Sequence, residues 1–229
     1  MFIAEGIKTV ADIMSLGNIP EVLYYVDDIN IPSEIKKRGE IVAYSTLERI
    51  SCLKTPPPVF AVFKNFKSSN AIDEKLLSEM TKDHILFLDN ISDPGNFGTI
   101  IRTADWFGFK NIVCSENTVE MYNPKVVQST MGAIANTNIY YVNSDEFLNL
   151  ARSKNIKIYG TFMDGKNIHK ENLEEKSIFI IGNEAKGISK EVESLISDRI
   201  SIPDNNPSKI SESLNAAVAC SILCYKLRN

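Results

Sequence analysis

Residues 85–104 read ILFLDNISDPGNFGTIIRTA, and this stretch decides the fold of the chain. Residues 85–88 are a short apolar run typical of a buried strand, and the pattern of residues 96–107 predicts a helix. In the polar loop between them, Gly95 and Gly98 permit tight turns and close backbone approach, and Asn96 is placed to cap the helix. A buried strand that leads into a helix in this way predicts a parallel α/β unit.

The same rhythm continues to the C-terminus. Further strands are predicted at residues 111–114, 139–142, 157–162, 178–181 and 199–202. Further helices are predicted at residues 125–133, 146–153, 190–196 and 214–227. Short continuous apolar strands that alternate with helices predict an α/β fold, a doubly wound and mostly parallel sheet covered on both faces.

The N-terminal part of the chain predicts a smaller α/β unit of its own. A helix is expected at residues 6–17, and strands are expected at residues 22–26, 41–44 and 59–63. The polar, serine-rich residues 66–70 favour a linker, and residues 71–80 favour a connecting helix. The predicted organisation is therefore a unit at 1–66, a linker with a connecting helix at 67–83, and a larger domain at 84–229.

Composition excludes several classes of protein. The net charge of −4 argues against a general nucleic-acid coat, although it allows an enzyme that grips one RNA through a local patch. No apolar run approaches the roughly 20 residues of a membrane span, and the N-terminus lacks the pattern of a signal peptide, so we expect a cytoplasmic protein. Four cysteines and two histidines fit no zinc spacing, so no metal is expected.

Two more polar islands follow predicted strands. Residues 181–189 read IGNEAKGIS, where Glu184 is either an exposed loop acid or a buried orienting group. The spacing is not that of a phosphate-binding ATPase loop, which needs Lys and then Ser or Thr directly after its second glycine. The third island begins at Ile202 and continues at Ser213 and Asn215, which either cap the last helix or face a ligand.

The last helix is apolar almost all round, which predicts that it is buried. In the first island, Arg102 is either a surface arginine or a group that holds a phosphate. All three islands stand at strand ends, and in a parallel sheet ligands bind at the carboxyl ends of the strands.

The order and wording of these islands resemble the motifs of the SpoU/TrmH family of RNA ribose 2′-O-methyltransferases, within the SPOUT superfamily. The match covers about residues 85–229, and residues 2–8, FIAEGIK, are similar to the family's small RNA-binding domain. The resemblance implies a C-terminal trefoil knot that cradles S-adenosylmethionine, mainly through backbone groups. It also implies a homodimer that methylates a ribose 2′-hydroxyl of RNA.

The resemblance further implies which residues form the site. Those expected in the cofactor pocket are Thr161, Gly182, Ile202 and Leu214. Arg102 is implied as the base or as the group that orients the ribose hydroxyl. The residues that would orient the arginine and the ribose are Asn96, Glu184, Ser213 and Asn215. Because arginine ordinarily stays protonated, positioning and charge stabilisation describe its role better than proton abstraction.

The chain departs from the family pattern at three places. Ala185 stands where the second motif commonly has glycine, a change that is tolerated unless the position needs a positive φ. The loop at 204–212 is longer than usual, and the chain starts almost directly at the FIAEG segment, where many relatives have a preceding basic helix.

Rival functions are distinguishable by experiment. A non-catalytic RNA-binding or ribosome-assembly protein with the same fold would bind RNA and transfer no methyl group. A nucleotide-dependent oxidoreductase would need Gly-x-Gly-x-x-Gly after its first strand, which the glycines here do not fit. The separate N-terminal unit favours ribosomal RNA over transfer RNA as the substrate.

Overall fold

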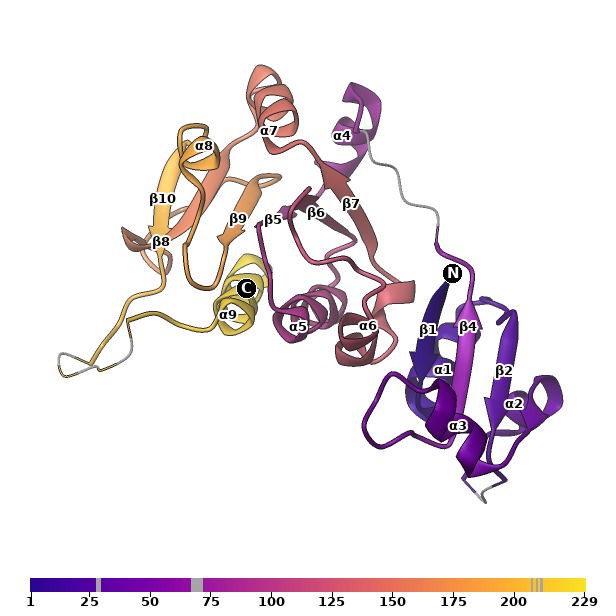
Figure 1. Ribbon diagram of the computed structural model, residues 1–229. Helices are drawn as coiled ribbons and strands as arrows, with labels where there is room; N and C mark the ends of the chain where they lie inside the picture. Colours follow the sequence, from indigo (N-terminus) through magenta and orange to yellow (C-terminus); the bar gives the residue numbers. More distant parts are fainter. Residues whose placement is uncertain (28–29, 67–71, 207, 209, 211) are drawn as a thin grey trace.

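The computed structural model describes residues 1–27, 30–66, 72–206, 208, 210 and 212–229, which form two sheets (Figure 1). The larger sheet has the order β10-β8-β9-β5-β6-β7, and all its neighbouring strands are parallel. Its strands are β5 (Ile85–Asp89), β6 (Asn111–Ser115), β7 (Asn138–Val142), β8 (Ile158–Asn167), β9 (Ile178–Gly182) and β10 (Asp198–Ser201). The predicted α/β fold with a mostly parallel sheet is confirmed.

Helices cover both faces of this sheet (Figure 1). One face carries α5 (Pro94–Trp106), α6 (Pro124–Thr130) with a short 3-10 turn (Ala133–Ala135), and α9 (Ala216–Arg228). The other face carries α4 (Glu74–Met80), α7 (Ser144–Ser153) and α8 (Lys190–Glu193). The helix α8 ends at Glu193 and is therefore shorter than the helix predicted at 190–196.

The strand β5 shows why the central strands are apolar along their whole length. Leu86 and Leu88 belong to the core on the α5 side, whereas Ile85 and Phe87 belong to the core on the α7 side. Successive side chains of a strand point to opposite faces, and both faces are covered here. Each fully buried side chain of this kind contributes about 1.5–3 kcal/mol to folding.

The smaller sheet has the order β1-β4-β2-β3, in which β4 is antiparallel to β1 and β2, and β2 is parallel to β3. Its elements are β1 (Phe2–Glu5), α1 (Ile7–Ser15), β2 (Val22–Tyr25), α2 (Ser33–Arg38), β3 (Glu40–Ile41), α3 (Tyr44–Ile50) and β4 (Val59–Phe63). The strand β1 was not predicted. The strand predicted at 41–44 is wrong beyond Ile41, because Tyr44 already begins α3.

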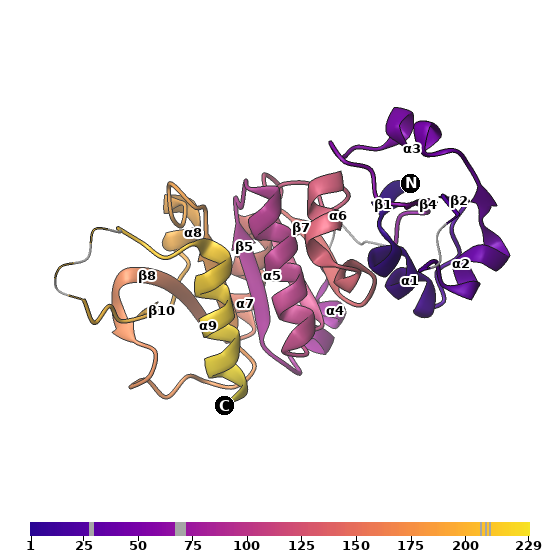
Figure 2. The same ribbon diagram turned by 90° about the horizontal axis from the view of Figure 1, so that it is seen from below.

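Aromatic side chains pack the two sheets together. The ring of Phe2 stacks on Tyr122 with centroids 4.8 Å apart, and the Tyr122 hydroxyl donates to the Phe66 carbonyl at 3.3 Å. Figure 2 shows the two parts side by side, with β1 facing α6. Of the predicted linker, residues 67–71 lie outside the described residues, and α4 provides the connecting helix.

The start of α5 differs from the prediction. The helix begins at Pro94, its cap is Asp93, whose carboxylate accepts the Asn96 N–H at 2.7 Å, and both Gly95 and Gly98 lie inside the helix. Asn96 is therefore not the cap. The expected close backbone approach is nevertheless present, because a Cβ at Gly98 would lie 2.4 Å from Ser129 Cβ on α6.

The last helix is buried on one face only. Ala217, Cys220 and Cys224 are buried, whereas Val218 is 48% exposed and Tyr225 is 59% exposed. The prediction of a helix buried all round is therefore wrong for its outer face. The helix itself lies beside α5, to which Ser221 is joined by a hydrogen bond with Thr103 (Figure 2). In the described part of the chain, no helix has both the length and the apolar surface that a membrane span requires.

Candidate active site

Two of the three islands start side by side at the carboxyl edge of the sheet. Asp89, the last residue of β5, pairs with Gly182, the last residue of β9. Because the two strands are parallel, the loops that follow them leave from the same edge. The loop after β9 folds back on itself through a bridge between Asn183 and Gly187.

Glu184 lies in the second island, and its carboxylate accepts hydrogen bonds from residues of the first island. One oxygen accepts from the Ser92 N–H at 3.2 Å and the Ser92 hydroxyl at 3.0 Å; the other accepts from the Asp93 N–H at 3.1 Å and Asn96 Nδ2 at 3.0 Å. Partial burial alone would raise the pKa of this carboxyl, but the hydrogen bonds from Asn96, Ser92 and Asp93 lower it below the ordinary value. Glu184 is thus partly buried and hydrogen-bonded to the first island, and it is not an exposed loop acid.

Asn96 extends this contact to the third island. Its Oδ1 accepts a hydrogen bond from Asn215 Nδ2 at 2.8 Å, while its own Nδ2 donates one to Glu184. Asn215 also caps α9, since its Oδ1 accepts the N–H groups of Ala217 and Val218 at 2.9 Å and 3.2 Å. Glu184, Asn96 and Asn215 therefore form one hydrogen-bonded chain that joins all three islands.

A cavity of about 680 Å³ lies beside this chain. The residues predicted for the cofactor all line it, together with two of those predicted for orientation: Thr161, Gly182, Ile202, Leu214, Glu184 and Ser213. Gly182 is needed for the shape of the loop above it, because a Cβ there would lie 2.4 Å from the backbone nitrogen of Ile188. Ser213 is exposed, and it does not cap α9.

Ala185 also lines the cavity and does not have a positive φ, whereas Gly187 does, at 70°. Alanine is therefore tolerated at position 185, as expected.

The sequence did not predict the outer wall of the cavity. Phe162, Asp164 and Arg199 line it, and the Arg199 guanidinium lies 3.6 Å from the Phe162 ring centroid and 2.6 Å from an Asp164 oxygen. Phe162 and Arg199 lay within predicted strands and were given no role, and Asp164 was missed because β8 was predicted to end at Phe162, whereas it continues to Asn167. Residues 161–165 read TFMDG and show no alternation of apolar and polar residues, so the local sequence carried no signal that the strand continues.

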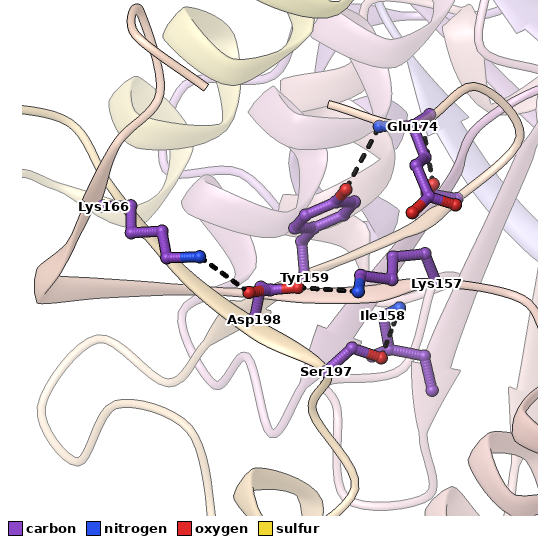
Figure 3. A network of polar contacts seen from close by, with 8 residues as sticks. Lys157, Ile158, Tyr159, Lys166, Glu174, Ser197 and Asp198 are labelled. Atoms are coloured by element: carbon purple, nitrogen blue, oxygen red, sulfur yellow. Dashed lines mark hydrogen bonds and ion pairs between the residues drawn. The ribbon is translucent and has the colours of Figure 1, made fainter. Parts of the chain in front are cut away.

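Figure 3 shows polar contacts that join β8 and the residue before it to β10. Asp198 accepts from Lys157 at 2.9 Å and from Lys166 at 3.0 Å, and these hydrogen bonds lower the pKa of its carboxyl. Ser197 Oγ accepts the N–H of Ile158 at 3.2 Å. The network holds the extended β8 against β10, the strand at the sheet edge.

Arg102 is not brought into the cavity. It is exposed on α5, and no described residue forms an ion pair or hydrogen bond with its guanidinium. It stands six positions after Asn96, so it lies about 9 Å further along the helix axis. As far as the described residues go, its guanidinium is therefore available to a group outside the protein.

The arrangement can orient a polar substrate next to a bound cofactor. The cavity combines apolar walls with a few fixed polar groups, and its volume lies within the roughly 300–1,000 Å³ of small-molecule sites. Among the residues that the structure describes, no three His, Cys, Asp or Glu side chains gather as metal ligands would.

This fold, with a cavity formed by the loops after β9 and β10, is typical of the class of RNA methyltransferases that the three islands resemble. A family model described as the SpoU rRNA Methylase family matches residues 83–225. The chain belongs to this family.

Similar proteins span nearly the whole chain. The 23S rRNA (guanosine(2553)-2′-O)-methyltransferase RlmP of Bacillus subtilis (strain 168) is 27% identical over 99% of this chain and 88% of its own. A solved structure from Porphyromonas gingivalis, described as TrmH family, is 32% identical, with a TM-score of 0.81 over 99% of this chain and 89% of that one. The SpoU methyltransferase AviRb from Streptomyces viridochromogenes, in complex with AdoMet, has a TM-score of 0.81 at 22% identity, over 99% of this chain and 89% of its own. The likeness to AviRb shows the fold alone.

Proposed function

We propose that the protein transfers a methyl group from S-adenosylmethionine to a ribose 2′-hydroxyl of ribosomal RNA, in the cytoplasm. The observation that carries the proposal is the hydrogen-bonded chain of Glu184, Asn96 and Asn215 beside the cavity. The three residues come from three islands that are far apart in the sequence. The similarity to RlmP, which acts on 23S rRNA, supports ribosomal over transfer RNA.

The cavity fits the cofactor in its size and in its lining. Ile202 and Leu214 offer apolar contacts, and Gly182 lines the cavity, where its missing Cβ lets the backbone of Gly187 and Ile188 fold close above it. AviRb, which shares the fold, was solved with AdoMet, and this supports the same cofactor here. When bound, the cofactor supplies an electrophilic methyl group on a sulfonium.

The residues of the chain position the ribose. Ser213 and Glu184 line the cavity, so they are placed to contact the nucleotide that enters it. Asn96 donates a hydrogen bond to Glu184, and Asn215 donates one to Asn96. Through these two bonds the asparagines fix the orientation of Glu184. Such preorganised groups act by holding the hydroxyl near the methyl group, which lowers the entropic part of the barrier.

Arg102 binds and orients the RNA rather than acting as a base. A guanidinium donates hydrogen bonds and does not accept them, and its fork matches a phosphate. Its exposed place on α5, about 9 Å along the axis from Asn96, suits a phosphate next to the reacting ribose. There it fixes the phosphate and, through it, the neighbouring ribose.

We also propose that the C-terminal segments form the trefoil knot of the family. Support comes from the loops after β9 and β10, which border the same cavity although they follow non-adjacent strands of the sheet. The N-terminal sheet is proposed to bind RNA, because the similarity to RlmP extends over it.

The exposed apolar face of α5 and α9 is proposed to pair with a second copy of the chain. Trp106 is 84% exposed and Tyr225 is 59% exposed, and such side chains on neighbouring helices form a typical docking surface. Arg102 lies on the same helix as Trp106, so the dimer would bring Arg102 near the interface.

The test is methyl transfer from radiolabelled S-adenosylmethionine into separate ribosomal and transfer RNA pools from cells that lack this protein. We expect label in the ribosomal pool, strongly reduced by Arg102→Ala. Label confined to transfer RNA would contradict the substrate. RNA binding without methyl transfer to either pool, in a protein that binds no cofactor, would indicate the non-catalytic alternative.

A further inference from the structure

Asp89 is a buried carboxylate that the proposed function does not use. It ends β5, and only 1% of it is exposed. It does not line the cavity, so it cannot touch a cofactor or substrate there. A carboxylate taken out of water is costly unless hydrogen bonds replace its hydration, which makes its partners informative.

Both oxygens of Asp89 hold loop residues. Oδ2 accepts the backbone N–H of Ser189 at 2.7 Å, and Oδ1 accepts Nδ2 of Asn90 at 2.7 Å. Asn90 has a positive φ of 57°, and its own N–H donates to Ser115 Oγ on β6 at 2.8 Å. Asp89 therefore ties the end of the second island to a first island that is itself fixed to β6.

The loop between Gly182 and Ser189 is fixed at both ends by this arrangement. Gly182 is held in the sheet next to Asp89, and Ser189 is held by the Asp89 side chain. At the start of the loop, Asn183 Nδ2 also donates to the Asn90 carbonyl at 2.6 Å. Residues 183–188 between these points all line the cavity, and they include Glu184.

We propose that Asp89 is a positioning residue for methyl transfer, which sets the shape of the 183–188 loop and hence cofactor affinity and the orientation of Glu184. This inference rests on the proposed function. Asp89 acts through Ser189 and Asn90, and it takes no part in the chemistry itself.

The substitution Asp89→Asn tests the inference with little change in shape. An amide has one acceptor oxygen and one donor nitrogen, so it keeps the bond from the Ser189 N–H only if its nitrogen faces Asn90 Nδ2. Two donors then meet at a part-buried site, and turning the Asn90 amide to relieve them would give up the contact of its Oδ1 with Ser115 Oγ. Adding Asn90→Asp restores a donor–acceptor pair with the polarity reversed, and aspartate tolerates the positive φ at that position.

Three readouts separate positioning from general stability: the melting temperature, the dissociation constant for S-adenosylmethionine by calorimetry, and amide hydrogen exchange at Ser189 without cofactor. We expect Asp89→Asn to weaken cofactor binding about tenfold or more and to speed exchange at Ser189. The double variant is expected to recover most of both effects. Asp73→Asn is the matched control, because Asp73 accepts the Leu76 N–H at 2.8 Å at the start of α4.

The inference is overturned if Asp89→Asn leaves exchange at Ser189 and cofactor affinity within twofold of the parent. It is also overturned if both losses follow the melting temperature and the double variant recovers neither. A parent protein that binds no cofactor would refute the proposed function instead. In that case exchange at Ser189 still decides whether Asp89 holds the loop.

Discussion

Asn96 and Asn215 stand 119 positions apart in the chain, and a hydrogen bond of 2.8 Å joins their side-chain amides. The bond connects the first turn of α5 with the cap of α9, two helices on the same face of the sheet. Since Asn96 also donates to Glu184, a change at Asn215 is transmitted to the wall of the cavity.

Asn215→Asp separates the two roles of Asn215. Aspartate caps a helix about as well as asparagine, so the bonds from the Ala217 and Val218 N–H groups persist and the free energy of unfolding should change by less than about 0.5 kcal/mol. The new side chain has no donor for Asn96 Oδ1 and repels it. We expect methyl transfer to fall about ten- to hundredfold.

The control for this variant is Asn143→Asp. Asn143 caps α7 in the same way, by accepting the Glu146 N–H at 3.1 Å, and lies on the opposite face of the sheet. It should leave both stability and turnover near the parent values. Equal turnover in Asn215→Asp and Asn143→Asp would show that the amide pair is not needed for the reaction.

Glu184 makes stability depend on acid pH. Hydrogen bonds from Asn96, Ser92 and Asp93 outweigh partial burial and lower the pKa of Glu184 below its ordinary value of 4.5. A carboxyl with a lowered folded-state pKa contributes stability above its unfolded pKa and loses it as the pH falls through the folded-state value. The stability difference between the parent and Glu184→Gln should therefore be constant near neutral pH and shrink in acid.

Urea unfolding of both proteins at a series of pH values measures this difference. Glu79→Gln, on α4 away from the site, is measured alongside as the control for the loss of a carboxylate. A difference that grows in acid would contradict the hydrogen-bonded carboxylate.

Gly98 allows α5 and α6 to pack closely. A Cβ at this position would lie 2.4 Å from Ser129 Cβ and 2.6 Å from the Val126 carbonyl oxygen, and a backbone atom cannot rotate away. Gly98→Ala should therefore destabilise the protein by about 1–3 kcal/mol, despite the better helix propensity of alanine. Denaturant unfolding measures the loss.

The neighbouring exposed residue gives the comparison. Thr99→Ala changes the same helix on its outer side and should shift stability by less than about 0.5 kcal/mol. If Gly98→Ala were as mild as Thr99→Ala, the helices would be further apart than described.

The strands of the large sheet are well predicted because the signal of each strand lies within its own residues. A parallel strand buried on both faces, such as Ile85–Asp89, must be apolar along its length, and this pattern is visible without knowing its neighbours. The cap of α5 was also visible, since Asp93 followed by Pro94 is typical of a helix start, but Asn96 was chosen instead.

Contacts between islands could not be predicted from local pattern. The partners of Glu184 depend on β5 and β9 being neighbours in the sheet, and nothing in residues 181–189 specifies this. The strand predicted at 41–44 fails for a similar reason, because its apolar residues fit a strand and yet Tyr44 begins α3. Tertiary context overrides local preference at both places.

The outer face of α5 and α9 yields the last prediction. Trp106 and Tyr225 are large, apolar and mostly exposed, at 84% and 59%, and a second copy of the chain would bury them. Trp106→Glu places a charge in that interface, where burial without a partner costs several kcal/mol. We expect light scattering to show the mass of a dimer for the parent and of a monomer for the variant. Ile19→Glu is the control, because Ile19 is 66% exposed in the N-terminal part, and this variant should stay dimeric. A parent that is monomeric at all concentrations, or a Trp106→Glu protein that remains a dimer, would show that another surface or none pairs the chains.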